Sequence, residues 1–286
     1  MVKHWIVGIS LLAVSSLSAQ DDLLGDDMPS EPLKTPVNFA FKTTRVVNLQ
    51  SVETLGEGVF DFKIQHRFGA LNTGASNAFG LDLATIRIGG EYGLTPKVTL
   101  GLGRSPVEKT VDGYAKIKWV QQMRGGGSPV SVLTVASAAY RNQNYTAEPT
   151  TVERLAYVGQ VIVGRKFSEK LSMQVVPSVV HYNWVNVAVP NTQFALGVGM
   201  RHKLTMRSSL NLEWIPVLSD KGMFYNSFSI GMDVETGGHV FQMGFTNSIG
   251  LSENLFLTRN TTQWNNAGIR FGFNMSRVFT LVDPRG

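Results

Sequence analysis

Apolar and polar residues alternate in a series of short runs between residues 58 and 281. In the run FDFKIQHR, residues 60–67, phenylalanine and isoleucine share one face, while charged and amide side chains share the other. A repeat of two residues is the signature of a β-strand. We therefore predict about 12 strands, within a range of 12–14. They lie at residues 58–68, 84–92, 98–104, 113–121, 129–140, 154–166, 171–182, 194–201, 209–214, 228–235, 239–247 and 269–281.

The links between these strands predict the topology. Short links are expected at residues 95–97, 123–128, 167–170, 204–206 and 236–238, and longer ones at 69–80, 105–112, 141–153, 183–191, 217–225 and 248–266. Short and long links alternate without exception in this scheme. Outer-membrane barrels have short periplasmic turns and longer extracellular loops. Pro177 falls inside one run, where it cannot donate a ladder hydrogen bond, so we expect a β-bulge there.

The two faces of the strands favour a membrane barrel over a soluble one. The apolar face carries large side chains throughout, whereas the polar face mixes small residues with charges of both signs. A charge facing lipid would cost about 2–4 kcal/mol at the midplane, so we expect the apolar face outside. The predicted fold is all-β, a closed antiparallel transmembrane β-barrel over residues 58–281. Its predicted lumen-lining residues are Asp61, Lys63, Arg67, Arg87, Glu91, Lys116, Lys118, Glu213, Asp233, Glu235 and Arg270.

Residues 20–57 precede the barrel and are expected to form a linker followed by a second element. Residues 20–36 are acidic, contain proline and have no period. Residues 37–54 alternate only in part, and three interpretations remain open: a lumen plug, a periplasmic cap or an extra strand. If they form a plug, its polar contacts would come from Arg45, Asn48, Gln50 and Glu53, with Arg45 and Glu53 paired to lumen charges.

The N-terminal residues of the chain predict export. Residues 1–19 combine a lysine, a short apolar run and small residues before Gln20, which is the pattern of a signal peptide. The apolar run is far shorter than the roughly 20 residues that a transmembrane helix needs. Residues 282–286 form a short tail after the last strand. We expect a mature protein in the bacterial outer membrane.

Composition excludes several classes of function. The chain has no cysteine, which removes disulfides and thiolate metal sites. Its net charge of +5 comes from scattered residues without basic blocks, so we expect no nucleic-acid partner. No histidine lies in a recognisable serine motif or at metal-ligand spacing. We predict a protein that is not an enzyme and that binds no metal or cofactor.

Several stretches resemble a known family. They are TRVVNLQSVET (44–54), FDFKIQHRFG (60–69), IRIGGEYGLTPKVTLGLGRS (86–105), ETGGHVFQMGFTNS (235–248) and IRFGFNMSRVFTL (269–281). With these segments the chain resembles an uncharacterised family of β-barrel proteins, a domain of unknown function, from Bacteroidetes-type Gram-negative bacteria. The resemblance implies an outer-membrane location and no established activity.

Two functions fit these patterns. The first is a narrow or gated passage for small polar or ionic solutes, since a barrel of this size encloses a lumen narrower than that of a 16-stranded porin. The alternative is a non-conducting structural or docking barrel, with residues 20–56 in contact with a periplasmic protein partner. In both cases we expect a monomer that contacts outer-membrane lipid.

Overall fold

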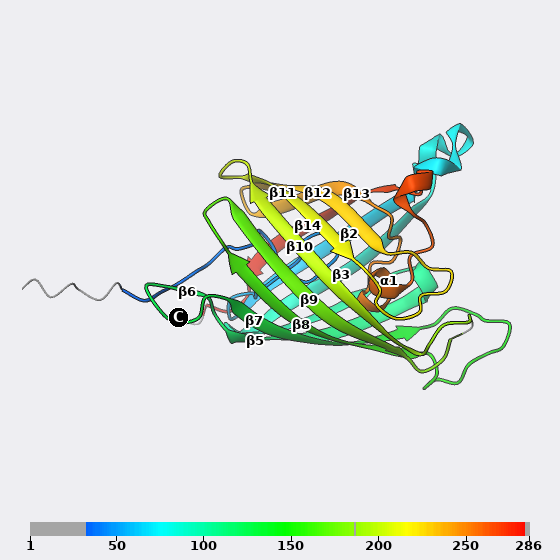
Figure 1. Cartoon of the computed structure of the whole chain (residues 1–286), viewed down its shortest axis with the longest axis horizontal. Coiled ribbons are helices and arrows are strands. Elements are labelled where there is room, and N and C mark those ends of the chain that lie inside the picture. The colour runs from blue at the N-terminus through cyan, green and yellow to red at the C-terminus, as the bar shows by residue number, and fades with distance from the viewer. Residues whose placement is uncertain (1–32, 186, 284–286) are drawn as a thin grey trace, which may run out of the picture. The chain divides into compact units, whose positions relative to one another are not determined.

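A computed structural model describes residues 33–185 and 187–283. Within this part of the chain, twelve antiparallel strands close into one barrel, in the order β10-β11-β12-β13-β14-β2-β3-β4-β5-β7-β8-β9 (Figure 1). The strands are β2 (Val59–Ala70), β3 (Ala84–Thr95), β4 (Val98–Arg104), β5 (Thr110–Val120), β7 (Ser131–Arg141), β8 (Leu155–Lys166), β9 (Leu171–Tyr182), β10 (Thr192–Lys203), β11 (Ser208–Ile215), β12 (Ser227–Thr236), β13 (His239–Thr246) and β14 (Arg270–Thr280). The prediction of a closed antiparallel barrel of about 12 strands is confirmed.

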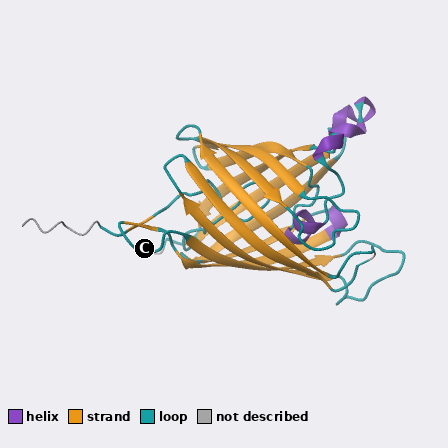
Figure 2. Ribbon diagram, viewed as in Figure 1, coloured by secondary structure: helices purple, strands orange, loops and turns teal. Residues whose placement is uncertain are grey.

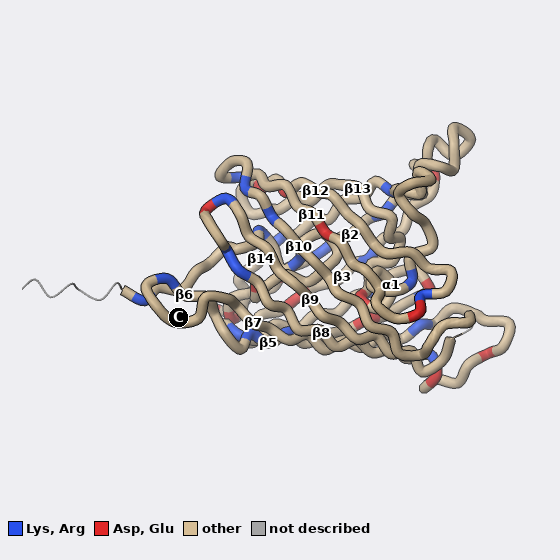
Figure 3. The backbone as a smooth tube through the Cα atoms, viewed as in Figure 1, with Lys and Arg blue, Asp and Glu red and all other residues tan. Residues whose placement is uncertain are grey.

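The alternating pattern places the polar face inside. On β2, Asp61, Lys63 and Arg67 are buried, whereas the intervening Phe60 and Phe62 remain partly exposed on the outer surface. Exposed and buried positions alternate on the other strands too, and residues of both charge signs are interspersed along them (Figure 3). On β7, β8 and β9, however, the inward face also carries fully buried apolar side chains, such as Leu133, Ile162 and Val176. An apolar outer surface allows the strands to contact lipid, while the polar side chains find partners within the barrel.

The links define two ends of the barrel, which we call the turn side and the loop side. The turn side carries the links at residues 96–97, 121–130, 167–170, 204–207 and 237–238, and the loop side carries those at 71–83, 105–109, 142–154, 183–191, 216–226 and 247–269. Strict alternation of short and long links is wrong at one position. The turn-side link 121–130 is longer than the loop-side link 105–109, because it contains β6 (Met123–Arg124), which pairs with β1 (Thr35–Pro36).

The expected bulge at Pro177 is also wrong. In the β9–β10 ladder Pro177 lies opposite Leu196 in an unbroken register. The β8–β9 ladder keeps one register on both sides of the proline and lacks pairs only beside it, between Gln160–Ser178 and Val163–Val175. A missing N–H therefore removes local hydrogen bonds without requiring an extra residue in the strand.

Helices are confined to the links (Figure 2). The α-helix α1 (Glu253–Thr258) lies in the link between β13 and β14, is buried along its whole length, and packs against β8, β9, β10 and β12. Short 3₁₀ turns form η2 (Leu71–Thr73), η3 (Ala75–Gly80), η4 (Val107–Lys109) and η5 (Trp264–Asn266). Among the described residues no helix is long and apolar enough to cross a membrane.

Parts of the predicted domain scheme lie outside the described residues. These parts are the signal peptide at residues 1–19, the linker as far as residue 32 and the end of the tail at residues 284–286.

Candidate functional site: the filled barrel interior

Residues 40–55, which we call the inner segment, lie inside the barrel. They form no strand of it and contain only one isolated bridge, between Arg45 and Gln50, which closes a tight turn. Within that turn the Val46 N–H donates to the Leu49 carbonyl oxygen over 2.8 Å. Every residue from 43 to 52 is buried. The interpretation of this region as an extra barrel strand is therefore excluded.

The tip of the inner segment is held by one carboxylate. Glu213 Oε2, on β11, accepts hydrogen bonds from the backbone N–H groups of Val47, Asn48 and Leu49 at 3.3, 2.9 and 2.8 Å. Its Oε1 accepts a fourth hydrogen bond, from Asn48 Nδ2 at 3.0 Å. Several N–H groups converging on one anion satisfy backbone donors that would otherwise be buried without partners.

Wall side chains from other strands satisfy the carbonyl groups of the same segment. Gln174 Nε2 donates to the Gln50 carbonyl oxygen over 2.7 Å, and Gln242 Nε2 donates to that of Val46 over 2.9 Å. Further contacts of this kind run from Asn274 to Val47 (3.0 Å), from Lys116 to Thr44 (3.1 Å) and from Arg201 to Ala40 (3.0 Å). The wall therefore takes over the hydrogen bonding that regular secondary structure supplies elsewhere.

Apolar side chains of the inner segment fit against glycines of the wall. A Cβ atom added to Gly197 would lie 2.8 Å from the Leu49 methyl groups, and one added to Gly164 would lie 2.5 Å from Val52. A Cβ at Gly199 would likewise lie 3.1 Å from Val46. These inward glycines leave the space that the segment fills, so wall and segment are matched in shape as well as in polarity.

A buried network of charges surrounds Thr44. Lys63 lies 2.8 Å from the Glu91 carboxylate and 3.4 Å from that of Asp61, and it also donates to Thr44 Oγ1. Thr44 and Tyr114 both donate to Glu91. Each buried charge in the network has an opposite charge or a hydroxyl group beside it, as burial in a low-dielectric interior requires.

A second group of charges lies on neighbouring strands. Arg87 forms a bidentate contact with Asp112, whose Oδ1 accepts from Arg87 Nε over 2.9 Å. The guanidinium occupies the space above Gly103, where an added Cβ would lie 2.3 Å from it. Arg67 donates to Asn48 Oδ1 and to Asn274 Oδ1, both over 2.9 Å, and so joins the wall to the inner segment.

The inner segment contacts α1 through buried side chains. Arg45 lies 2.8 Å from Glu253 Oε1, which also accepts a hydrogen bond from Gln50 Nε2 at 2.9 Å. Burial alone would raise the pKa of Glu253, but the nearby Arg45 and Arg87 outweigh it and hold the pKa below its usual value. The same carboxylate raises the pKa of Arg45 despite burial, so both groups stay charged at neutral pH.

The predicted site residues therefore fall into three groups. Most are buried in the barrel interior, where they contact the inner segment or other wall side chains: Asp61, Lys63, Arg67, Arg87, Glu91, Lys116, Glu213 and Asp233. Lys118 and Glu235 lie at the turn-side rim, where Glu235 pairs with Lys42 and its side chain is 45% exposed. Arg270 lies toward the loop side and donates to the Phe68 carbonyl oxygen.

The four predicted plug residues all lie in the inner segment, but one of their predicted contacts is wrong. Arg45, Asn48 and Gln50 contact the wall or α1 as described above. Glu53 does not pair with a lumen charge: its carboxylate accepts a hydrogen bond from the Phe41 N–H of the same segment, over 3.2 Å. Glu53 is close to the turn side and remains partly exposed, so its charge needs no buried partner.

Sequence reasoning missed several interior residues, among them Glu253. This glutamate lies in a long link without alternation, so no periodic signal marks it as an interior residue. Asp112 precedes the run assigned to its strand, which the sequence places at residues 113–121 and the structure at Thr110–Val120. Tyr114 lies inside that run, on the same face as Lys116, and its aromatic ring did not mark it as an interior polar residue. In the described part of the chain no three His, Cys, Asp or Glu side chains are grouped so that they could hold a metal ion.

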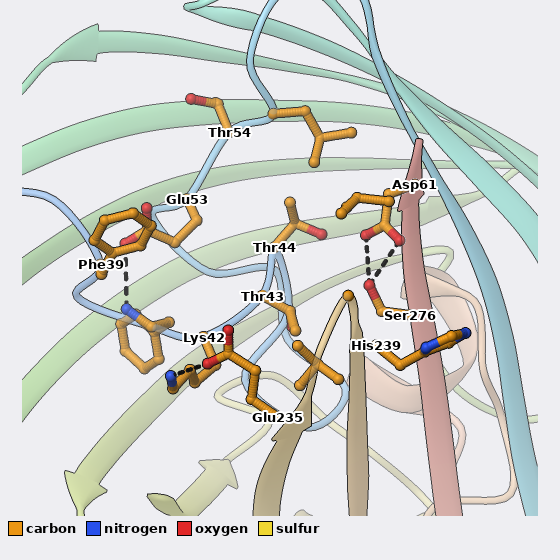
Figure 4. A pocket seen from close by; sticks show the side chains of 15 residues that line it. Phe39, Lys42, Thr43, Thr44, Glu53, Thr54, Asp61, Glu235, His239 and Ser276 are labelled. Atoms are coloured by element: carbon orange, nitrogen blue, oxygen red, sulfur yellow. Dashed lines mark hydrogen bonds and ion pairs between the residues drawn. The ribbon is translucent and has the colours of Figure 1, made fainter. Parts of the chain in front are cut away.

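A cavity of about 230 Å³ remains on the turn side, between the inner segment and the wall. Figure 4 shows Asp61 and Ser276 on the wall side, with Thr43 and Thr44 of the inner segment facing them. Ser276 Oγ donates to Asp61 over 2.6 Å, and Lys42 pairs with Glu235 at the rim. The cavity ends at the inner segment, which fills the interior beyond it.

Comparison with known proteins identifies the family. The profile described as "Membrane bound beta barrel domain (DUF5777)" matches residues 41–279. The solved structures that resemble the chain include a KdgM porin (8% identity, TM-score 0.48, covering 77% of this chain and 99% of the porin) and a NanC porin (6%, 0.49, 77% and 98%). A third is the Acinetobacter baumannii outer membrane protein Omp33 (9%, 0.45, 77% and 97%). No curated protein matches the chain.

Proposed function

We propose a gated passage for small polar or ionic solutes as the function of this chain, which belongs to the family of membrane bound β-barrel domains just described. The observation that supports the proposal is a polar barrel wall whose partners come from a segment that forms no part of the barrel ladder. Withdrawal of the inner segment would leave the twelve-strand ladder intact. It would also expose the wall, which is polar on most strands and carries apolar side chains on the inward faces of β7, β8 and β9.

The closed state is strongly favoured. Five apolar side chains of the inner segment are buried: Phe41, Val46, Val47, Leu49 and Val52. At about 1.5–3 kcal/mol each, their burial stabilises the closed state by on the order of 10 kcal/mol. Thermal opening would then be very rare, and a partner that binds the withdrawn segment must supply the difference.

The opened wall would carry charges of both signs. Its acids are Asp61, Glu91, Asp112, Glu213 and Asp233, and its bases are Lys63, Arg67, Arg87, Lys116 and Arg201. A balanced wall gives little preference between cations and anions, in contrast to pores lined by a ring of one charge. We therefore propose small polar solutes and ions of either sign as the solutes that pass.

The bacterial outer membrane is the proposed location. The apolar outer surface contacts lipid, and the longer links at the loop side would face the cell exterior, as in other outer-membrane barrels. In that orientation the inner segment enters from the periplasm, where a partner could bind it.

Planar-bilayer conductance tests the passage. The full chain is compared with a variant lacking residues 34–55, and heat-modifiable gel mobility confirms that both fold. We expect rare or no openings for the full chain and steady conductance for the shortened one. A folded but silent shortened barrel would refute the passage.

A specific feature of the turn side favours the alternative, a barrel that docks periplasmic partners. A cavity of about 620 Å³ opens there, lined by basic side chains and by the two acids Glu169 and Glu235. The basic residues are Lys42, Lys166, Arg201, Lys203 and Arg207. This excess of positive charge suits an acidic protein surface, and a silent shortened barrel in the bilayer experiment would favour this function.

A further inference from the structure

A second polar site lies at the loop side, apart from the inner segment. A small cavity of about 160 Å³ is formed there by η4, the end of β7 and the links that precede β10, β12 and β14. Its charged residues are Glu108, Arg141 and Arg259. None of the three contacts the inner segment, and the gated passage does not use them.

Two arginines and one tyrosine form a stack at this cavity. The guanidinium carbons of Arg141 and Arg259 lie 4.9 and 4.2 Å from the ring centroid of Tyr182, which is fully buried. Arg259 also lies 4.8 Å from the Phe224 ring. Stacking on aromatic faces fixes both guanidinium planes and lowers the conformational entropy that ligand binding would cost.

The positive charge of the cavity is only partly compensated. Glu108 is the acid beside these arginines, and its carboxylate lies 3.7 Å from Arg141, beyond hydrogen-bond distance. Among the described residues, the buried Arg141 Nε and Arg259 Nη1 have no hydrogen-bond partner. Arg141 is only 4% exposed and lines the cavity. Buried donors of this kind are costly unless a ligand satisfies them.

The backbone beside Glu108 supports a role other than packing. Glu108 and Lys109 have φ angles of +50° and +46°, in the left-handed region that side chains other than glycine rarely adopt. Strain of this kind persists where the surrounding structure enforces it and concentrates at functional sites. Burial also raises the pKa of the Glu108 carboxyl, while Arg141 and Arg259 partly offset the effect.

We propose that this loop-side cavity binds a small organic monocarboxylate, whose carboxylate replaces Glu108 as the partner of Arg141 and also pairs with Arg259. A planar guanidinium binds a carboxylate through two parallel hydrogen bonds. One excess positive charge matches one negative charge, whereas a dianion would be repelled by Glu108. The apolar part of the lining, Val107, Val185, Phe224, Ile249 and Leu255, would cover a short carbon chain. The volume corresponds to about five water molecules at roughly 30 Å³ each, enough for a molecule of a few carbon atoms.

Titration of the full chain in detergent micelles with butanoate tests the site, with binding followed by ligand-observed NMR. We expect saturable binding of butanoate, roughly tenfold weaker binding of acetate because two methylene groups are lost, and none of the neutral butanamide. Inorganic phosphate is the competing anion. Binding of phosphate as tight as that of butanoate would overturn the assignment to a carboxylate, and the absence of saturable butanoate binding would overturn the site.

Two substitutions with opposite expected effects separate recognition from damage to the fold. Arg259→Gln should weaken butanoate binding by about tenfold or more, since it removes a charged hydrogen bond. Glu108→Gln should tighten binding, because it removes the competing carboxylate. Arg165→Gln, an exposed arginine near the turn-side end of β8, is the matched control and should leave binding unchanged. If Glu108→Gln weakens binding as Arg259→Gln does, the proposal is wrong.

The outcome does not depend on the gated passage. Binding is measured on the closed barrel without any conductance. If the barrel binds butanoate but the shortened form never conducts, the loop-side site is supported and the passage is refuted. If the shortened form conducts but the full chain does not bind butanoate, the passage is supported and the loop-side site is refuted.

Discussion

Two segments fill the same barrel from opposite sides, and they are held differently. The inner segment (residues 40–55) enters from the turn side with almost no secondary structure of its own, and wall side chains satisfy its backbone groups. The link 247–269 enters from the loop side as α1, whose buried Phe256 and Leu257 pack in the apolar core. The strands β13 and β14 tether this link at both ends.

The difference indicates which segment can move. When the inner segment leaves, the hydrogen bonds between its backbone and the wall are replaced by hydrogen bonds to water. This replacement changes the net free energy little. Only its apolar side chains oppose the movement. Withdrawal of α1 would expose the same apolar core, to which both segments contribute side chains, and would in addition strain the ends of the two strands that tether it. We infer that α1 is a fixed part of the barrel and that the inner segment is the gate.

The largest expected effect concerns the fixed segment. Phe256→Ala should lower the free energy of unfolding by about 3–5 kcal/mol, because the ring is fully buried and leaves a cavity. Urea unfolding of the protein in detergent micelles measures the change. Phe256→Leu, which keeps most of the volume, should cost less than about 1.5 kcal/mol. Equal costs for the two variants would show that α1 does not pack as a core element.

The next effect concerns the gate. Glu213→Gln should weaken the closed state by about 1.5–3 kcal/mol, because the charged acceptor of three backbone N–H groups is lost. The natural chain has no cysteine. A Ser51→Cys substitution therefore reports opening through its rate of thiol labelling, which we expect to rise about 10- to 150-fold.

A matched carboxylate provides the control for Glu213. Asp233 is equally buried but accepts hydrogen bonds from the wall side chains of Asn211, Gln242 and Ser209, not from the inner segment. Asp233→Asn should therefore change thiol labelling much less than Glu213→Gln. Similar labelling rates in the two variants would mean that the wall as a whole, and not the tip contact, holds the gate.

The smallest effect concerns the shape of the wall. Gly197→Ala places a methyl group 2.8 Å from the end of the Leu49 side chain, so one of them must shift, at a cost of about 1–3 kcal/mol to the closed state. Labelling of Ser51→Cys should rise, and the free energy of unfolding in urea should fall by no more than the same roughly 1–3 kcal/mol. Gly113→Ala, whose methyl group would meet its nearest neighbour at 3.6 Å, is the control and should change neither quantity. A fall of the urea midpoint without faster labelling would contradict a mobile inner segment.

The strands of this protein can be predicted from its sequence because the two faces of each strand lie in different environments. Lipid on one side and a polar interior on the other impose the repeat of two, so runs such as residues 60–67 identify both the strand and its inward face. The predicted lumen residues follow from the same rule, which is why Lys63, Glu91 and Glu213 were found. Register and link length were less certain, since β6 lengthens a turn that no periodic signal marks.

The segments that fill the barrel could not be predicted from a periodic pattern in this way. Residues 43–52 are surrounded on all sides, so both polar and apolar side chains are buried and no period survives. Glu253 gave no signal for the same reason, although it is the partner of Arg45. The one local sign in the sequence that the barrel is filled is the repeated glycine at inward positions such as Gly197 and Gly199. Small residues there leave room for Leu49 and Val46, but glycine alone does not reveal which side chain will fill the space.

The sequence by itself determined a β-barrel with an apolar outer surface and a polar wall, because alternation is a local property of each strand. Only the tertiary structure decided that the wall encloses protein rather than water, since the contacts of Glu213, Gln174 and Gln242 with the inner segment join residues more than 100 positions apart. Such contacts depend on the closure of the barrel, which brings distant strands around one short segment. Closure is a property of the whole strand ladder, so no single stretch of the sequence predicts it.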